Sequence, residues 1–138
     1  MELREAKQEL KDYLSNKRYI ESKLEEVECL TEQINKVTAT YSDMPKATSG
    51  NGKEELIVKK LDTEREIYKY LLELTEQKRQ IEQTLRKLEA RYRNVLDFIY
   101  IKGMRQIDVA AKEGYSHRQL QRVLRAAYKA YAQERGNK

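Results

Sequence analysis

The strongest constraint on the fold is a repeat of apolar residues at alternating steps of three and four. In a first run, eight of ten positions are apolar; the run is Leu3, Ala6, Leu10, Tyr13, Lys17, Ile20, Leu24, Val27, Thr31 and Ile34. In a second run, nine of twelve are apolar; it is Ile57, Lys60, Glu64, Ile67, Leu71, Leu74, Lys78, Ile81, Leu85, Leu88, Tyr92 and Val95. This spacing puts each run on one narrow stripe of a helix, as in coiled coils. The sequence therefore predicts two long helices that face one another through these stripes.

The segment between the two runs predicts a break in the helix. Residues 38–52 are rich in small, β-branched and turn-forming residues and include Pro45, so we expect a loop at about 39–53 and no helix within it. Each flanking helix would be roughly 50 Å long at 1.5 Å per residue. Helices of equal length can fold back as an antiparallel hairpin, either within one chain or between the two chains of a homodimer.

Charge is distributed unevenly along the chain. The 138 residues carry a net charge of +5, but residues 1–90 hold 17 Lys and Arg against 19 Asp and Glu. Residues 91–138 hold 11 against 4, a net charge of +7 on about a third of the chain. A basic segment attached to a nearly neutral helical one is typical of a nucleic-acid-binding domain on a spacer or assembly element. A merely solvated basic face explains the charge equally well.

Several function classes find no support in the composition. A single cysteine, Cys29, rules out an internal disulfide, and no cluster of Cys and His has the spacing of zinc ligands. One His, one Cys and no phosphate-cradling loop leave no group to carry catalysis, so we expect a protein that is not an enzyme and needs no metal or cofactor. No apolar run approaches the roughly 20 residues that span a bilayer, and Met1–Glu5 lack an apolar signal core. We therefore expect a cytoplasmic protein that does not enter a membrane.

The last third of the chain predicts three shorter helices. A dense apolar block over residues 95–101 is followed by Gly103, which indicates the end of a helix. A second helix is expected from near Arg105 to Gly114, and a third from Ser116 to about Gln133. Their expected core is Leu96, Phe98, Ile99, Ile107, Ala110, Tyr115, Leu120, Val123 and Leu124.

The last two of these helices have the residue pattern of a helix-turn-helix. Such a motif needs a small residue where its helices cross and a residue that adopts positive φ at the turn. Ala110 and Gly114 meet those needs, and Leu120, Val123 and Leu124 give the second helix a buried stripe. This order of residues indicates DNA binding.

The final helix carries the candidate base-reading residues. Ser116 can cap the helix through its hydroxyl, which leaves the outward residues to enter the major groove; they are His117, Arg118, Gln121, Arg122 and Arg125. Arg can form two hydrogen bonds with guanine, and Gln can form two with adenine. Candidate contacts to the DNA backbone are Arg105, Gln106, Lys112, Ser116 and Lys129. Tyr128 and Tyr131 are expected to pack in the core.

The last third of the chain, over roughly residues 91–132, resembles region 4 of bacterial sigma factors. The resemblance rests on residues 93–107, Ala110, Gly114–Ser116 and the basic final helix. The upstream hairpin, with Ser42–Pro45 in its loop, resembles that of small sigma-region-4-like regulators from phages and prophages of Gram-positive bacteria, of the late-transcription activator type. The resemblance implies a sequence-specific regulator that binds double-stranded promoter or operator DNA in the cytoplasm of a bacterial host and acts with host RNA polymerase. The chain has no room for a promoter-melting region, so it should not start transcription by itself.

The sequence thus predicts an all-α protein with two domains, an antiparallel coiled-coil-like hairpin at 1–90 and a helix-turn-helix domain at 91–138. Two other functions fit the same pattern. One is a DNA-packaging protein like a small terminase subunit, which also joins a helix-turn-helix to helical oligomerisation elements. The other is a protein-interaction module whose basic face binds an acidic protein.

Overall fold

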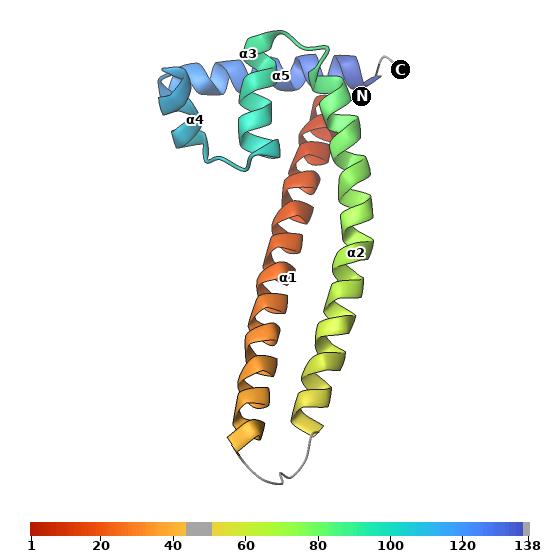
Figure 1. The fold of residues 1–138 in the computed structure, drawn as a ribbon. Helices are drawn as coiled ribbons and strands as arrows, with labels where there is room; N and C mark the ends of the chain where they lie inside the picture. The colour runs from red at the N-terminus through yellow and green to blue at the C-terminus, as the bar shows by residue number, and fades with distance from the viewer. Residues whose placement is uncertain (44–50, 137–138) are drawn as a thin grey trace. The chain divides into compact units, whose positions relative to one another are not determined.

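The computed structural model describes residues 1–43 and 51–136 of the chain, and within them the fold is all-α. The elements are α1 (Leu3–Asp43), α2 (Asn51–Leu85), α3 (Ala90–Leu96), a π-helical turn η1 (Asp97–Ile101), α4 (Gln106–Glu113) and α5 (His117–Gly136). Figure 1 shows α1 and α2 as a long antiparallel pair within one chain, followed by the shorter C-terminal helices. The predicted fold class is confirmed. In the described part of the chain, no helix is both long and apolar enough to cross a membrane.

The chain divides into two compact units. One contains both ends of the chain, Met1–Asn16 and Leu74–Lys138, and is called the terminal unit; the other, Lys17–Glu73, is called the middle unit. The terminal unit therefore combines the first turns of α1 and the last turns of α2 with all the shorter helices. The predicted division at residue 90 was made on charge and motif and stays a prediction.

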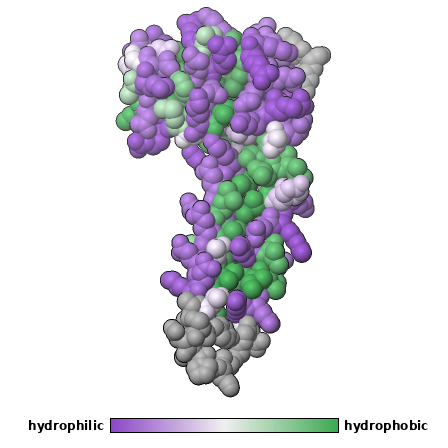
Figure 2. Space-filling view, in the orientation of Figure 1, coloured by the Kyte–Doolittle hydropathy of each residue, from purple (hydrophilic) through white to green (hydrophobic). Residues whose placement is uncertain are grey.

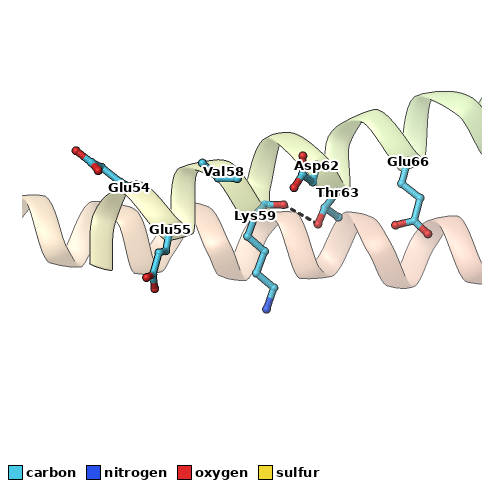
Figure 3. A pocket seen from close by; sticks show the side chains of 7 residues that line it. All are labelled: Glu54, Glu55, Val58, Lys59, Asp62, Thr63 and Glu66. Carbon is cyan, nitrogen blue, oxygen red and sulfur yellow. Dashed lines mark hydrogen bonds between the residues drawn. The ribbon is translucent and has the colours of Figure 1, made fainter. Parts of the chain in front are cut away.

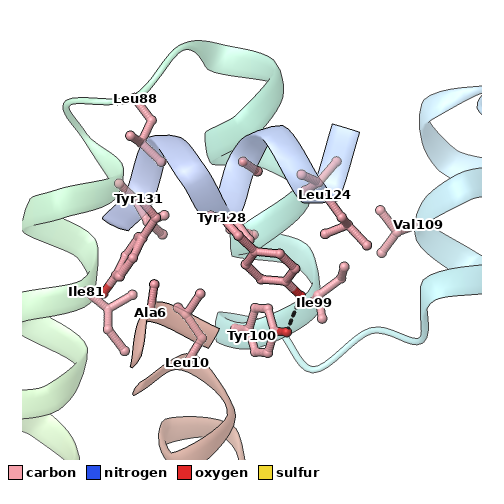
Figure 4. Close-up of a cluster of buried hydrophobic side chains, with 14 of the residues drawn as sticks. Ala6, Leu10, Ile81, Leu88, Ile99, Tyr100, Val109, Leu124, Tyr128 and Tyr131 are labelled. Atoms are coloured by element: carbon pink, nitrogen blue, oxygen red, sulfur yellow. Dashed lines mark hydrogen bonds between the residues drawn. The ribbon is translucent and has the colours of Figure 1, made fainter. Parts of the chain in front are cut away.

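The core of the terminal unit is built around α5. Tyr131 is completely buried, and the same face of α5 buries Leu120, Leu124 and Ala127. Figure 4 shows this face among side chains from the other helices of the unit. The buried side chains that join it in one cluster are Ala6, Leu10, Tyr13, Ile81, Leu85, Leu88, Val95, Leu96, Ile99, Tyr100, Val109 and Ala110. The last helix is thus enclosed by residues from both ends of the sequence, and Tyr128 and Tyr131 are packing residues as predicted.

Polar contacts at Glu9 connect three helices of the terminal unit. The Tyr131 hydroxyl donates to Oε2 of Glu9 at 2.7 Å, and Nε of Arg135 donates to Oε1 at 3.1 Å. Arg135 also donates from Nη2 to Oε1 of Gln80, at 2.8 Å. Because a carboxylate removed from water needs donors, these contacts fix where α5 crosses α1 and α2.

The middle unit is a two-helix segment with a narrow interface. Ile20 and Leu30 of α1 and Thr63 and Ile67 of α2 are buried. Beside this seam, the Tyr19 ring meets Tyr70 edge to face at 5.2 Å between centroids. Two helices bury less apolar surface than three or more, so one side of each remains exposed.

The residues that α2 turns inward differ from the predicted stripe at several positions. Thr63 is buried where Glu64 was predicted, and Gln77 accepts a hydrogen bond from Asn16 at 3.2 Å where Lys78 was predicted. Ile57 and Leu71, also placed on the predicted stripe, are exposed. The physical reason is that burying a Glu or Lys charge costs far more than burying Thr or Gln, so the helix turns these charges outward.

The prediction that residues 38–52 hold no helix is wrong at both ends. Helix α1 continues to Asp43, and α2 already begins at Asn51. β-Branched residues lower helix propensity by less than about 1 kcal/mol each, and the first proline is Pro45. In addition, the Thr38 hydroxyl bonds the carbonyl of Ile34 within the helix. The rest of the predicted loop, residues 44–50, lies outside the described residues.

The second long helix also ends earlier than its apolar run predicted. Helix α2 stops at Leu85, and the amides of Lys87 and Leu88 then bond the carbonyls of Thr84 and Leu85 in a tight turn. The side chain of Leu88 is buried in the core of the terminal unit. This packing overrides helix propensity, and no glycine or proline marks the break in the sequence.

The buried tyrosines make the stability of the protein sensitive to alkali. Burial raises the pKa of Tyr100, Tyr128 and Tyr131, and the bond to Glu9 raises the pKa of Tyr131 further. A raised pKa stabilises the folded state, and this contribution is fully present below the unfolded-state pKa of about 10. The contribution is lost as the pH rises through the folded-state pKa. We expect the free energy of unfolding to fall above pH 10, by at most about 1.4 kcal/mol per pH unit for each tyrosine.

Urea unfolding followed by circular dichroism between pH 8 and 11.5 measures this effect. Tyr131→Phe should flatten the alkaline slope. Tyr70→Phe is the matched control, since the Tyr70 side chain is exposed and the substitution should leave the slope unchanged. Equal slopes in the two variants would contradict the assignment to buried tyrosines.

Candidate nucleic-acid interface

The turn between α4 and α5 is set by Gly114. Its backbone has φ +73° and ψ +27°, a left-handed conformation, and the amide of Tyr115 then bonds the carbonyl of Ala110 at 2.8 Å. A side chain with a Cβ rarely adopts this conformation, whereas glycine adopts it freely. The predicted role of Gly114 at the turn is confirmed, and Gly103, with φ +71°, ends the preceding helical segment as predicted.

Ser116 and Gln119 cap the first turn of α5 reciprocally. The amide of Gln119 donates to Oγ of Ser116 at 3.1 Å, and the amide of Ser116 donates to Oε1 of Gln119 at 2.8 Å. The Ser cap was predicted, whereas the return bond from Gln119 was not. The signal for it was the Ser-x-x-Gln spacing, which defines a capping box. Both helix ends at this turn are therefore held by local contacts.

α5 separates its buried and exposed residues along its length. Leu120, Leu124 and Tyr128 are buried, whereas most of the predicted DNA-contacting residues of this helix are exposed. We call four exposed cations at steps of three and four the basic ridge; they are Arg118, Arg122, Arg125 and Lys129. Residues at these steps lie on one face of a helix. The ridge follows one exposed face for about 16 Å at 1.5 Å per residue.

The two other predicted base readers lie near the start of α5. His117, the first residue of the helix, is exposed. Gln121 is half-buried, and its Nε2 donates to Oε1 of Gln106 on α4 at 2.8 Å. This bond orients the Gln121 amide and leaves its own Oε1 and the Nε2 of Gln106 as hydrogen-bonding groups. Gln106 therefore has a positioning role beside the backbone contact predicted for it.

Two of the three cations predicted to touch the DNA backbone lie at the two ends of α4, and the third, Lys129, lies on α5. Arg105 pairs with Asp108 at 3.0 Å, but both side chains are exposed, so solvent screens the pair and a phosphate can replace the carboxylate. At the other end, the Lys112 ammonium lies 5.3 Å from the centroid of the Phe98 ring. Lys102 lies 5.0 Å from the same centroid. Two ammonium groups thus lie near one aromatic ring, and Lys102 also pairs with Asp97 at 3.0 Å. Sequence reasoning missed this arrangement.

One residue of the predicted core lies outside it. Ile107 is 70% exposed, whereas Val109 and Ala110 of the same helix are buried. At about 100° per residue, Ile107 lies on the opposite side of the helix from Val109, so the run of four apolar residues in five had to divide. Phe98, Tyr115 and Val123 of the predicted core are only partly buried.

Not every cation of the basic segment is directed to solvent. Arg135 is held by Glu9 and Gln80, as described above. Arg91 lies over the ring of Tyr92, 4.8 Å from its centroid, and pairs with Glu89 at 3.5 Å. Of the two, only Arg135, with its side chain 12% exposed, is withdrawn from solvent in this way; Arg91 stays 56% exposed despite its contacts.

The middle unit has a hollow of quite different character. It measures about 580 Å³ and is lined by Glu54, Glu55, Val58, Lys59, Asp62, Thr63 and Glu66. Figure 3 shows these side chains along α2, with the Thr63 hydroxyl bonded to the Lys59 carbonyl. Four carboxylates against one ammonium repel phosphate, so this surface does not suit nucleic acid.

No family model matches this chain, and neither a curated protein nor a solved structure matches it.

The turn geometry gives a direct test of the motif. Gly114→Ala should lower the free energy of unfolding by about 1–2 kcal/mol, because an L side chain is disfavoured at positive φ. Gly114→Asn should cost less, since asparagine tolerates this conformation. A Cβ on Gly114 meets no atom within 4 Å, so the loss reports backbone conformation and not a clash.

Urea unfolding of both variants measures the difference. Gly52→Ala is the control, because Gly52 is helical and a Cβ there also meets nothing within 4 Å. That change should not destabilise the protein. A loss at Gly52 as large as the loss at Gly114 would refute the conformational explanation.

Proposed function

We propose that the protein is a sequence-specific DNA-binding regulator of transcription that inserts α5 into the major groove. The observation that carries the proposal is the basic ridge, since it is exposed on a helix whose other face is buried in the core. The turn at Gly114 and the capping box at Ser116 fix where this helix begins. A helix of this kind fits the width of the major groove.

Different residues of the basic ridge and its surroundings suit different bases. Arg118 and Arg122 suit guanine, because a guanidinium can donate two parallel hydrogen bonds to O6 and N7. Gln121 suits adenine, and its bond to Gln106 orients the amide before DNA arrives. His117 and Arg125 complete the base-reading set near the two ends of this surface.

Backbone contacts come from both sides of the recognition helix. Arg105, Gln106 and Lys112 lie on or beside α4, which crosses the phosphates in helix-turn-helix complexes. Ser116 and Lys129 add contacts at the beginning of α5 and farther along it. Such contacts fix position on the duplex and supply salt-dependent affinity, while base contacts supply the choice of sequence.

The resemblance to sigma region 4 supports the biological part of the proposal. A phage late-gene activator would bind promoter or operator DNA in a bacterial host and act together with the host RNA polymerase. Recognition through hydrogen bonds and phosphate contacts requires no cofactor. The hairpin would then serve as an assembly or spacer element beside the DNA-binding helices.

Selection from a randomised duplex pool at near-physiological salt tests the proposed function. The intact protein should enrich a defined motif, because base contacts discriminate between sequences by about 1–3 kcal/mol each. Salt-sensitive retention without enrichment would instead support DNA packaging or architectural binding. If the protein retained no duplex, the remaining hypothesis would be a protein-interaction module.

Single substitutions separate base reading from phosphate contact. Arg122→Ala should cost about 1–3 kcal/mol on the selected site and relax its sequence preference. Lys112→Ala should weaken binding to all duplexes alike and lower the slope of affinity against salt by about one. Fluorescence anisotropy on selected and random duplexes, at several salt concentrations, measures both effects.

Lys69→Ala is the matched control for these variants. It removes an exposed cation from the middle unit and should change neither affinity nor salt slope. If Arg122→Ala and Lys112→Ala lost affinity equally on selected and random DNA, the two assigned roles would be wrong.

A further inference from the structure

α2 carries a second apolar stripe that the hairpin does not cover. We call it the outer stripe; its members are Ile57, Leu61, Tyr68, Leu71 and Leu72. All five are exposed, from 38% at Ile57 to 67% at Tyr68. Leu61, Tyr68 and Leu72 follow Ile57 at steps of four, seven and four, and Leu71 lies three residues after Tyr68, so all five lie on one side of the helix. Glu64 occupies the position between Leu61 and Tyr68.

This stripe is separate from the seam that α2 shares with α1. Thr63 and Ile67 lie on the inner side and are buried, whereas the stripe residues between and around them are not. Figure 2 shows hydrophobic residues gathered over the exposed surface of the hairpin. Single exposed apolar residues are normal, but a contiguous group of them marks an interaction surface.

We propose that the outer stripe binds the outer stripe of a second copy of this chain, with the two α2 helices antiparallel about a two-fold axis. In that arrangement Ile57 lies opposite Leu72 of the second copy, and Leu61 lies opposite Tyr68. The axis passes between residues 64 and 65. A two-fold interface must be self-complementary, and this stripe meets that condition because four of its five residues are arranged symmetrically about its centre.

Charge at the centre of the stripe selects this arrangement over others. Glu64 and Arg65 are neighbours and are both exposed. About the proposed axis, Glu64 faces Arg65 of the second copy and Arg65 faces Glu64, which gives two opposite-charge pairs. Parallel packing would instead place Glu64 against Glu64, and like charges in contact are unfavourable. The antiparallel pairing thus matches both the apolar and the charged residues of the stripe.

The length of the stripe is sufficient for a helical interface. From Ile57 to Leu72 it covers about 22 Å of helix at 1.5 Å per residue, or four turns. Two hairpins joined in this way form a four-helix assembly, which buries the apolar surface that a two-helix hairpin leaves exposed. All the residues involved belong to the middle unit, so the proposal does not depend on DNA binding.

Sedimentation equilibrium of the full chain, without DNA, tests the proposal. We expect a mass twice the 16.4 kDa of one chain. Leu61→Lys should give a monomer with unchanged helical circular dichroism, because Leu61 is 48% exposed within the chain. A monomeric wild-type protein at about 100 µM, or a dimer that survives Leu61→Lys, would overturn the proposal. Either result would mean that the stripe does not bind a second copy of itself.

A charge exchange identifies the orientation. Glu64→Arg and Arg65→Glu should each weaken the dimer at least about tenfold, because each places like charges at the axis. An equimolar mixture of the two variants should restore association, since each chain then supplies the charge that the other lacks. Asp62→Arg is the matched control on the same helix and should leave the dimer intact. Equal weakening without restoration on mixing would exclude the antiparallel arrangement.

Discussion

Burial of one face of α5 organises the whole terminal unit. Tyr131 is completely enclosed by residues from both ends of the sequence, and its hydroxyl is satisfied by Glu9. Once this face is fixed, the opposite face has to point to solvent, because helical geometry separates the two sides. The basic ridge is exposed for that reason and not because its residues are merely charged. Packing energy thus determines which side chains are available for recognition.

The turn and its neighbours were predictable from local chemistry. Gly114 and Ser116 have roles that follow from backbone φ and from hydroxyl capping, and these depend on nearby residues alone. The division at Ile107 was also visible, since helical periodicity puts Ile107 on the opposite side of the helix from Val109. The end of α2 at Leu85 could not, because the cause is the long-range burial of residues such as Leu88. The face that α2 turns inward is likewise determined by the free-energy cost of burying charged side chains.

The candidate site shows the same division between local and long-range causes. Exposure of Arg118 and Arg122 follows from spacing along α5, so sequence reasoning reached it. The bond from Gln121 to Gln106 joins two helices across 15 residues of sequence, and the pattern of either helix alone carries no sign of it. The same holds for Lys102 and Lys112, which a shared aromatic ring brings together. Contacts of this kind arise only after the helices have packed.

The chain uses its limited apolar content in two ways. In the terminal unit, several helices enclose one core and leave little large apolar surface exposed apart from Ile107 and Met1. In the middle unit, two helices share one seam, and a helix pair cannot cover a second stripe. Leu61 and Leu72 of that stripe remain 48% and 59% exposed in the isolated chain, so much of their apolar surface stays in water. Their symmetric placement about Glu64 and Arg65 has a physical use only when two copies meet.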